Sequence, residues 1–291
     1  MAFRKIADVR RAPPQHWVGD GFPVRSMFSY DGDAKALSPF LLLDYAAPAV
    51  FEPAEVPRGV GEHPHRGFET VTIAYQGEIE HRDSGGNAGR IGAGDVQWMT
   101  AASGVVHEEF HGRAFTKKGG TLEMVQLWVN LPARFKMSKP AYQDLLSKQI
   151  PVVEIPGGSL RVIAGDFQGS KGPARTFTPV DLWDLRLKAG ASLEAALPEG
   201  HTAALLNLHG AATLGTSTSL GEHELAVFER RGGAIRIEAA KDSTLLLLSG
   251  EPIDEPVVGY GPFVMNTQAE IRQAITDYQA GRMGALSASR R

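Results

Sequence analysis

The chain has 291 residues, 43% of them hydrophobic, with a formal net charge of −3 and no cysteine. This length predicts about two domains or one large β domain, because single hydrophobic cores rarely grow beyond about 250–300 residues. The charge argues against direct binding of nucleic acid or an anionic membrane surface, and the lack of cysteine excludes disulfides and thiolate metal ligands. The apolar runs are too short to span a membrane and the first residues are unlike a secretory signal, so we expect a soluble cytoplasmic protein.

Short runs rich in Val, Ile, Leu, Thr and Phe alternate with glycine and proline along most of the chain, which is typical of all-β sandwiches and barrels. In the first half we expect strands at residues 3–10, 24–30, 40–45, 69–75, 78–83, 96–100 and 122–129. A loop with three prolines is expected at residues 46–61. These elements predict one antiparallel β-barrel over residues 1–135.

Residues 136–151 are charged and contain Pro140, so they are predicted to link two domains. The strand pattern resumes at residue 152, which predicts a second barrel over residues 152–291. Near the end, Thr267 followed by Glu270 forms a capping-box pattern. It precedes apolar residues at helical spacing, which predict a short C-terminal helix that packs on a barrel: Ile271, Ala274, Ile275 and Tyr278.

Five of the nine histidines lie between residues 63 and 111, in or near the motifs HPHRGFE (63–69) and HEEFH (107–111). Successive side chains of a strand point to opposite faces, so His63 and His65 share one face of their strand. His107, Glu109 and His111 share one face of another strand for the same reason. Two imidazoles that face a third imidazole and a carboxylate can bind one transition metal. The pattern therefore predicts a metal site in the first half of the chain.

Longer strings make the chain resemble the pirin family over nearly its whole length: SPFLLLDY (38–45), HPHRGFETVT (63–72), GDVQWMTAASGVVHEE (94–109), QLWVNLP (126–132) and EPVVGYGPFVMNT (255–267). The resemblance implies two tandem cupin-type antiparallel β-barrels, with a metal in the first barrel only. It also implies that the metal, usually Fe(II), is bound by His63, His65, His107 and Glu109. Imidazole and carboxylate ligands also accept Mn, Co, Ni, Cu or Zn. Glu108, a charge between two ligands, is expected to point away from the metal.

The resemblance further implies quercetin 2,3-dioxygenase activity, in which dioxygen cleaves the central ring of a flavonol and carbon monoxide is released. Glu109 would then act as general base as well as ligand. The partners would be a small aromatic substrate and dioxygen, and the protein is expected to be a monomer. The alternative is a non-enzymatic metal-binding protein that modulates a transcription factor or a metabolic enzyme, with the metal state as the switch. A carbohydrate isomerase or storage-type double cupin would share the barrels but lacks these strings.

Three further side chains are candidates near the site. The general cupin pattern makes Glu69 a ligand, whereas the pirin resemblance gives that role to Glu109, so we expect Glu69 beside the ligands or against Arg66. His81 and His111 are expected at the rim of the metal pocket, because the entrances of such pockets contain both polar and apolar side chains. The other four histidines stand at unrelated spacings and are expected to be structural or solvated: His16, His201, His209 and His223.

Overall fold

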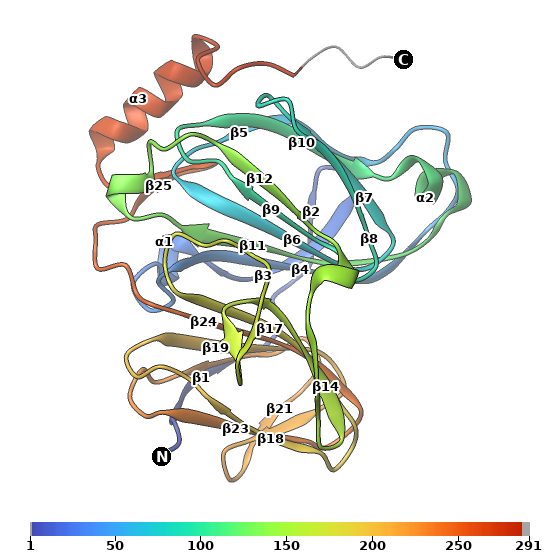
Figure 1. The fold of residues 1–291 in the computed structure, drawn as a ribbon. Helices are drawn as coiled ribbons and strands as arrows, with labels where there is room; N and C mark the ends of the chain where they lie inside the picture. Colours follow the sequence, from blue (N-terminus) through green and yellow to red (C-terminus); the bar gives the residue numbers. More distant parts are fainter. Residues whose placement is uncertain (1, 287–291) are drawn as a thin grey trace. The chain divides into compact units, whose positions relative to one another are not determined.

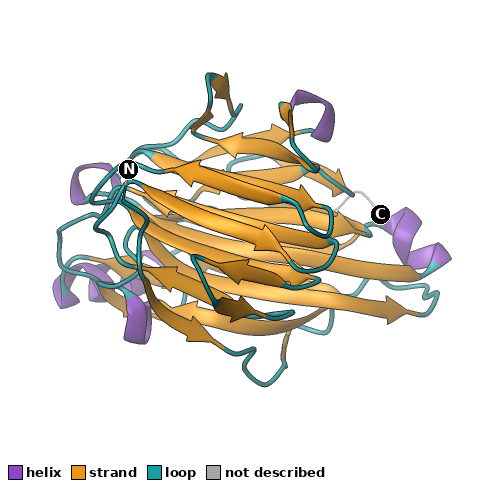
Figure 2. Ribbon diagram, turned by 90° about the horizontal axis from the view of Figure 1, so that it is seen from below, coloured by secondary structure: helices purple, strands orange, loops and turns teal. Residues whose placement is uncertain are grey.

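The computed structural model describes residues 2–286, which divide into two compact units. The first comprises residues 14–34, 40–147 and 253–286, and we call it the histidine unit. The second unit comprises residues 2–13, 35–39 and 148–252. Strands dominate both units, and the helices are few and short (Figures 1 and 2). The expected all-β fold with a C-terminal helix is confirmed.

The histidine unit contains a seven-stranded and a four-stranded antiparallel sheet. Across the large sheet the strands are β12 (Ala141–Leu145), β9 (Val96–Thr100), β6 (Phe68–Gln76), β11 (Gly120–Asn130), β4 (Phe40–Phe51), β3 (Phe22–Ser29) and β2 (His16–Val18). Across the small sheet they are β5 (Gly59–His65), β10 (Val105–His111), β7 (Glu78–Asp83) and β8 (Ala88–Gly92). The remaining elements are the hairpin β25 (Val258–Tyr260) and β26 (Phe263–Met265), the helices α1 (Tyr30–Asp33), α2 (Arg113–Lys118) and α3 (Gln268–Gln279), and the 3-10 turn η1 (Ala133–Phe135).

Apolar side chains from both sheets of this unit meet in one core. Phe22, Ala74 and Met124 of the large sheet pack with Ile79 and Ile91 of the small sheet. In β7 the buried and partly exposed residues alternate, as a strand with one face toward the core requires. The inner faces of the two sheets therefore bury the apolar surface of this unit.

The second unit repeats this two-sheet plan. Its large sheet has the order β1 (Ile6–Arg10), β22 (Leu225–Phe228), β19 (Thr202–His209), β24 (Ser243–Gly250), β17 (Val180–Leu187), β14 (Gly158–Ala164) and β13 (Val152–Ile155). The small sheet has the order β18 (Ser192–Ala196), β23 (Ala234–Ala239), β20 (Ala212–Leu214) and β21 (Thr218–Leu220). A short hairpin joins β15 (Asp166–Phe167) to β16 (Ser170–Lys171), and the 3-10 turn η2 (Ser147–Gln149) stands where the chain enters the unit. Its hydrophobic core cluster contains Trp183 and Leu247 together with Ile235 and Ile237.

The boundaries of the units differ from the predicted domains 1–135 and 152–291. Strand β1, near the amino terminus, pairs with β22 and belongs to the second unit. The final segment, from residue 253 on, belongs instead to the histidine unit. The predicted linker 136–151 contains the strand β12, which lies at the edge of the large sheet beside β9, and the turn η2. Local composition cannot reveal such exchanges, since they depend on which distant strand or core accepts each segment.

Helix α3 begins at the predicted cap. The hydroxyl of Thr267 accepts a hydrogen bond from the backbone N–H of Glu270 at 3.2 Å. Ile271 and Ala274 are buried against Phe263 and Met265, and Ile275 is partly buried against the same cluster, where α3 lies beside β25 (Figure 1). Tyr278, the last residue of the predicted stripe, is 39% exposed. Within residues 2–286, no helix combines the length and hydrophobicity that crossing a membrane requires.

Candidate metal centre

Strands β5 and β10 bring three of the predicted ligands together. His63 and His65 end β5, and His107 lies directly opposite His63 on β10. Directly opposed residues of an antiparallel pair point to the same face of the sheet. The ring centroids are 4.2 Å apart for His63 and His107, 4.8 Å for His65 and His107, and 4.9 Å for His63 and His65. One nitrogen from each ring lies within 4.8 Å of the others, which is close enough for a shared ion.

The fourth predicted ligand, Glu109, is paired regularly with β7, the second strand that neighbours β10. The pairing of β10 with β5 contains an irregularity between His107 and Glu109, whereas the pairing with β7 is regular and sets Glu109 opposite His81. The Glu109 carboxylate therefore forms a ligand group with His107 and His81, within 4.8 Å. Glu109 still lines the same cavity as His63 and His65. Three of the predicted ligands thus line one cavity, and the fourth, His107, belongs to both ligand groups.

The protonation and hydrogen bonding of these imidazoles suit a metal. Burial, followed by the neighbouring histidines, lowers the pKa of His65 and of His107 well below the ordinary value, so both rings are neutral. The Nδ1 of His65 and the Nε2 of His107 are buried without a hydrogen-bond partner. His63 Nδ1 lies 2.8 Å from the carbonyl of Gly61, which leaves its Nε2 for another contact. A buried nitrogen without a hydrogen-bond partner destabilises a protein unless a ligand binds to it. Neutral imidazole is the form that binds transition metals. The donor set therefore fits one divalent transition metal.

Glu69 and Glu108 are not part of the centre. The chain turns at Gly67, whose φ of +93° breaks the strand, so Glu69 lies in the large sheet. There it accepts a hydrogen bond from Thr100 Oγ1 at 2.7 Å, and burial raises its pKa to about 7. The expected contact with Arg66 is wrong, because Arg66 pairs with Asp277. Glu108 points away from the ligands as predicted, onto the outer face of the small sheet.

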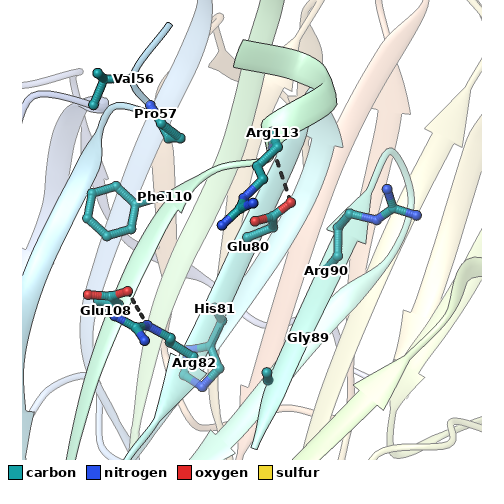
Figure 3. Close-up of a pocket in the computed structure, with 11 residues that line it drawn as sticks. Val56, Pro57, Glu80, His81, Arg82, Gly89, Arg90, Glu108, Phe110 and Arg113 are labelled. Carbon is teal, nitrogen blue, oxygen red and sulfur yellow. Dashed lines mark hydrogen bonds and ion pairs between the residues drawn. The ribbon is translucent and has the colours of Figure 1, made fainter. Parts of the chain in front are cut away.

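Figure 3 shows that outer face. Glu108 pairs there with Arg82, beside Phe110, in a surface groove of about 710 Å³. The even-numbered residues Glu80 and Arg82 of β7 and Glu108 and Phe110 of β10 line the groove, and the odd-numbered His81 also reaches it. The odd-numbered His107 and Glu109 belong to the ligand groups. The alternation of a strand thus separates the charged outer face from the ligand face.

His81 and His111 are not rim residues, contrary to the sequence-based expectation. They are only 3% and 2% exposed. The Nε2 of His111 donates to the carbonyl of Gly21 at 2.8 Å, and its ring packs on Phe51, which makes it a core histidine. His81 lies 3.2 Å from His107, nitrogen to nitrogen. Sequence reasoning missed this role, although the i, i+2 spacing of His81 and Asp83 was a signal that both share the inner face.

A cavity of about 310 Å³ opens onto His63, His65 and Glu109. Its other walls are mostly apolar: Val18, Phe22, Val24, Val60, Met124 and Trp128. The exceptions are Asp44 and Gln126, which the sequence did not single out.

These two polar residues belong to a row that crosses the large sheet. Ser26, Asp44, Gln126 and Thr72 are successive cross-strand neighbours. Asp44 accepts a hydrogen bond from Ser26, and burial raises the pKa of its carboxyl group. The Thr72 hydroxyl lies 2.8 Å from Gln126 Oε1 and 3.3 Å from Glu109 Oε1. The row therefore connects the candidate ligand Glu109 with the far wall of the cavity.

The chain is similar to known protein families, individual proteins and solved structures. Residues 21–129 match the family model described as Pirin, and residues 182–284 match the one described as Pirin C-terminal cupin domain. The chain is 56% identical to a Pseudomonas aeruginosa protein named "Putative quercetin 2,3-dioxygenase", covering 96% of this chain and 98% of that one. A tomato (Solanum lycopersicum) pirin-like protein is 42% identical, covering 91% of this chain and 88% of that one. The crystal structure of a quercetin 2,3-dioxygenase from Acinetobacter baumannii is similar with a TM-score of 0.96 and 50% identity, covering 98% of this chain and 100% of that chain. The matches confirm the expected pair of cupin-type domains.

Proposed function

Since the chain belongs to the pirin family, we propose that it is a metal-dependent dioxygenase of the quercetin 2,3-dioxygenase type, which cleaves flavonols such as quercetin. One observation carries the proposal: the imidazoles of His63 and His65 and the carboxylate of Glu109 line a mostly apolar cavity of about 310 Å³. A cavity of this size and lining suits a small planar ligand, because apolar walls bury its rings while a few polar groups fix its orientation.

The proposed ligands are His63, His65, His107 and Glu109, and the proposed metal is Fe(II), with Mn, Co, Ni, Cu and Zn as ions that the same donors accept. When bound, such a metal supplies Lewis acidity and a place for dioxygen to react. The similarity to proteins named quercetin 2,3-dioxygenase supports the flavonol as substrate.

The side chains of the cavity have separate tasks in this proposal. Glu109 accepts the proton of the flavonol 3-hydroxyl, which raises the electron density of the ring that reacts with dioxygen. Thr72 is within hydrogen-bond distance of the Glu109 carboxylate and holds its orientation. Trp128 and Phe22 cover the rings of the substrate and exclude water. Asp44 and Gln126 offer hydrogen-bond acceptors to hydroxyls on the substrate's outer ring.

The test is turnover of quercetin by iron-loaded protein. We expect loss of the flavonol absorbance together with consumption of dioxygen and release of carbon monoxide. The His65→Ala variant should fold and lose this activity, whereas His16→Ala, outside both ligand groups, should keep it. Iron-loaded protein that leaves flavonols intact would contradict the dioxygenase proposal.

One observation supports a second candidate, a non-enzymatic metal-binding protein that modulates a transcription factor or a metabolic enzyme. The groove on the outer face of the small sheet has charged walls, with Arg82, Arg90, Arg113, Glu80 and Glu108 close to the ligand strands (Figure 3). Metal-dependent retention of a protein partner, lost on charge reversal at Arg113 while flavonols stay intact, would favour this candidate. The monomeric state and the cytoplasmic location stay predictions from the sequence.

A further inference from the structure

His81 lies between a candidate ligand and a carboxylate. Its Nδ1 is 3.2 Å from His107 Nδ1, and its Nε2 is 3.4 Å from Asp83 Oδ2. The three residues are at most 5% exposed, so water does not compete for these contacts. His81 and Asp83 have no role in the proposed reaction. Together with His107 they form a buried row of polar groups, and such networks are usually retained for a structural or functional reason.

The hydrogen atoms of this chain can be assigned from elementary chemistry. A neutral imidazole has one N–H and one acceptor nitrogen, and a carboxylate only accepts. The Nε2 of His107 has no hydrogen-bond partner. If that nitrogen binds the metal, the proton of His107 stands on Nδ1 and is donated to His81 Nδ1. His81 then carries its own proton on Nε2 and donates it to Asp83. This assignment satisfies every contact in the chain.

The far end of the chain is fixed. Asp83 Oδ1 accepts hydrogen bonds from the backbone N–H groups of Gly85 at 2.8 Å and of Asn87 at 3.0 Å, and the Asn87 amide contacts both oxygens. The ring of His81 stacks on Tyr142, with centroids 5.1 Å apart and planes 16° apart. The carboxylate and the plane of the histidine are thus held in place before any metal binds.

We propose that His81, anchored by Asp83, is a positioning residue that holds His107 in the Nδ1–H tautomer and directs its Nε2 to the metal. The inference rests on the metal site of the proposed function, and it assigns two residues that the ligand set does not include. Hydrogen-bond partners of metal-bound histidines fix the ring and raise its basicity, and their loss typically weakens metal binding by about 10–100-fold. The competing arrangement makes His81 itself a ligand, since His81, His107 and Glu109 also lie within 4.8 Å. In that case the Nδ1 of His107 would bind the metal and could carry no proton.

The tautomers of His81 and His107 can be determined by NMR in metal-free protein, without flavonol and without turnover. Long-range proton–nitrogen correlation spectra of metal-free protein labelled in its histidines distinguish Nδ1–H from Nε2–H rings. Loss of single signals in His81→Gln and His107→Gln assigns them. We expect the Nδ1–H form for His107 and the Nε2–H form for His81. An Nε2–H form of His107, or an Nδ1–H form of His81, overturns the proposal.

The second measurement is the affinity for Ni(II), determined by competition with a chelator. Asp83→Asn and His81→Phe, which keeps a ring on Tyr142, should each weaken Ni(II) binding by about 10–100-fold while the number of nitrogen donors in X-ray absorption stays constant. Arg82→Ala, the neighbour on the outer face of β7, is the matched control and should bind as the parent does. Unchanged affinity in both variants, or loss of one nitrogen donor in His81→Phe, overturns the proposal.

Protein that binds Ni(II) in this way but leaves flavonols intact would contradict the proposed function only. Because the spectra of metal-free protein decide the tautomers by themselves, the two failures are distinguishable. Asp83→Asn is nearly isosteric, so its Ni(II) affinity tests the proposal if His81→Phe does not fold.

Discussion

The guanidinium of Arg66 contacts the carboxylate of Asp277 at 2.7 Å, although 211 residues separate them in the sequence. Arg66 directly follows the candidate ligand His65, and its Nε also donates to the carbonyl of Ser103, just before β10. Asp277 is on α3. A single ion pair therefore ties the C-terminal helix to the segments that flank both ligand strands.

Asp277→Asn should destabilise the protein by about 3 kcal/mol, because removing one partner of a buried ion pair leaves the other charge uncompensated. The measurement is urea unfolding of the metal-free protein at neutral pH. Arg272→Ala, an exposed change on the same helix, should stay within about 0.5 kcal/mol of the parent. Equal unfolding midpoints for Asp277→Asn and the parent would show that the pair adds no stability.

The same pair predicts a pH dependence. Hydrogen bonds from Arg66 and Gln273 lower the pKa of Asp277 to about 2, from 3.8. A carboxyl group whose pKa is lower in the folded state stabilises the fold above the unfolded value, and this contribution is lost as the pH falls through the folded value. The stability difference between the parent and Asp277→Asn should be constant above about pH 5 and shrink between about pH 4 and 2. A difference that persists unchanged to the acid end would contradict this origin.

Glu69 predicts the opposite pH dependence. Burial raises its pKa to about 7, so the folded protein holds a proton that the unfolded chain releases near 4.5. Stability should therefore fall as the pH rises from about 4.5 to about 7, by about 3 kcal/mol from this group alone. Glu69→Gln, which cannot ionise, should remove that slope in a series of denaturation curves. A slope that is unaltered in Glu69→Gln would assign the pH dependence to other groups.

Metal binding should stabilise the protein. With metal at about 100 times its dissociation constant, the expected gain is about 2.7 kcal/mol, because the ion binds the folded state only. Thermal unfolding with and without Fe(II) or Ni(II) measures it. His107→Ala should abolish the shift, since His107 belongs to both ligand groups, whereas His16→Ala should keep it. A full shift in His107→Ala would exclude the proposed centre as the binding site.

Asp44→Asn should weaken binding of quercetin by about 10-fold without changing the metal content, because a hydrogen bond to a charged acceptor is worth about 1.5–3 kcal/mol. A flavonol without hydroxyls on its outer ring should bind the parent and the variant equally. Titration of both ligands into metal-loaded protein makes the comparison. An equal loss for both flavonols would mean that Asp44 shapes the cavity and does not recognise the hydroxyls.

The sequence alone determined the features that depend on local periodicity. Alternation along a strand put His63, His65, His107 and Glu109 on inner faces and turned Glu108 outward, and the structure has this arrangement. The capping pattern at Thr267 likewise marked the start of a helix. These predictions succeed because they need only the geometry of a few neighbouring residues.

Only the tertiary structure decided which distant segments meet. It gave β1 to the second unit and α3 to the histidine unit, buried His111 in the core and placed His81 against His107. It also separated Glu69 from the ligands. The physical reason is that strand partners, bulges and buried ion pairs are chosen by the free energy of the whole fold. Residues far apart in the chain contribute to that choice, and local pattern does not record it.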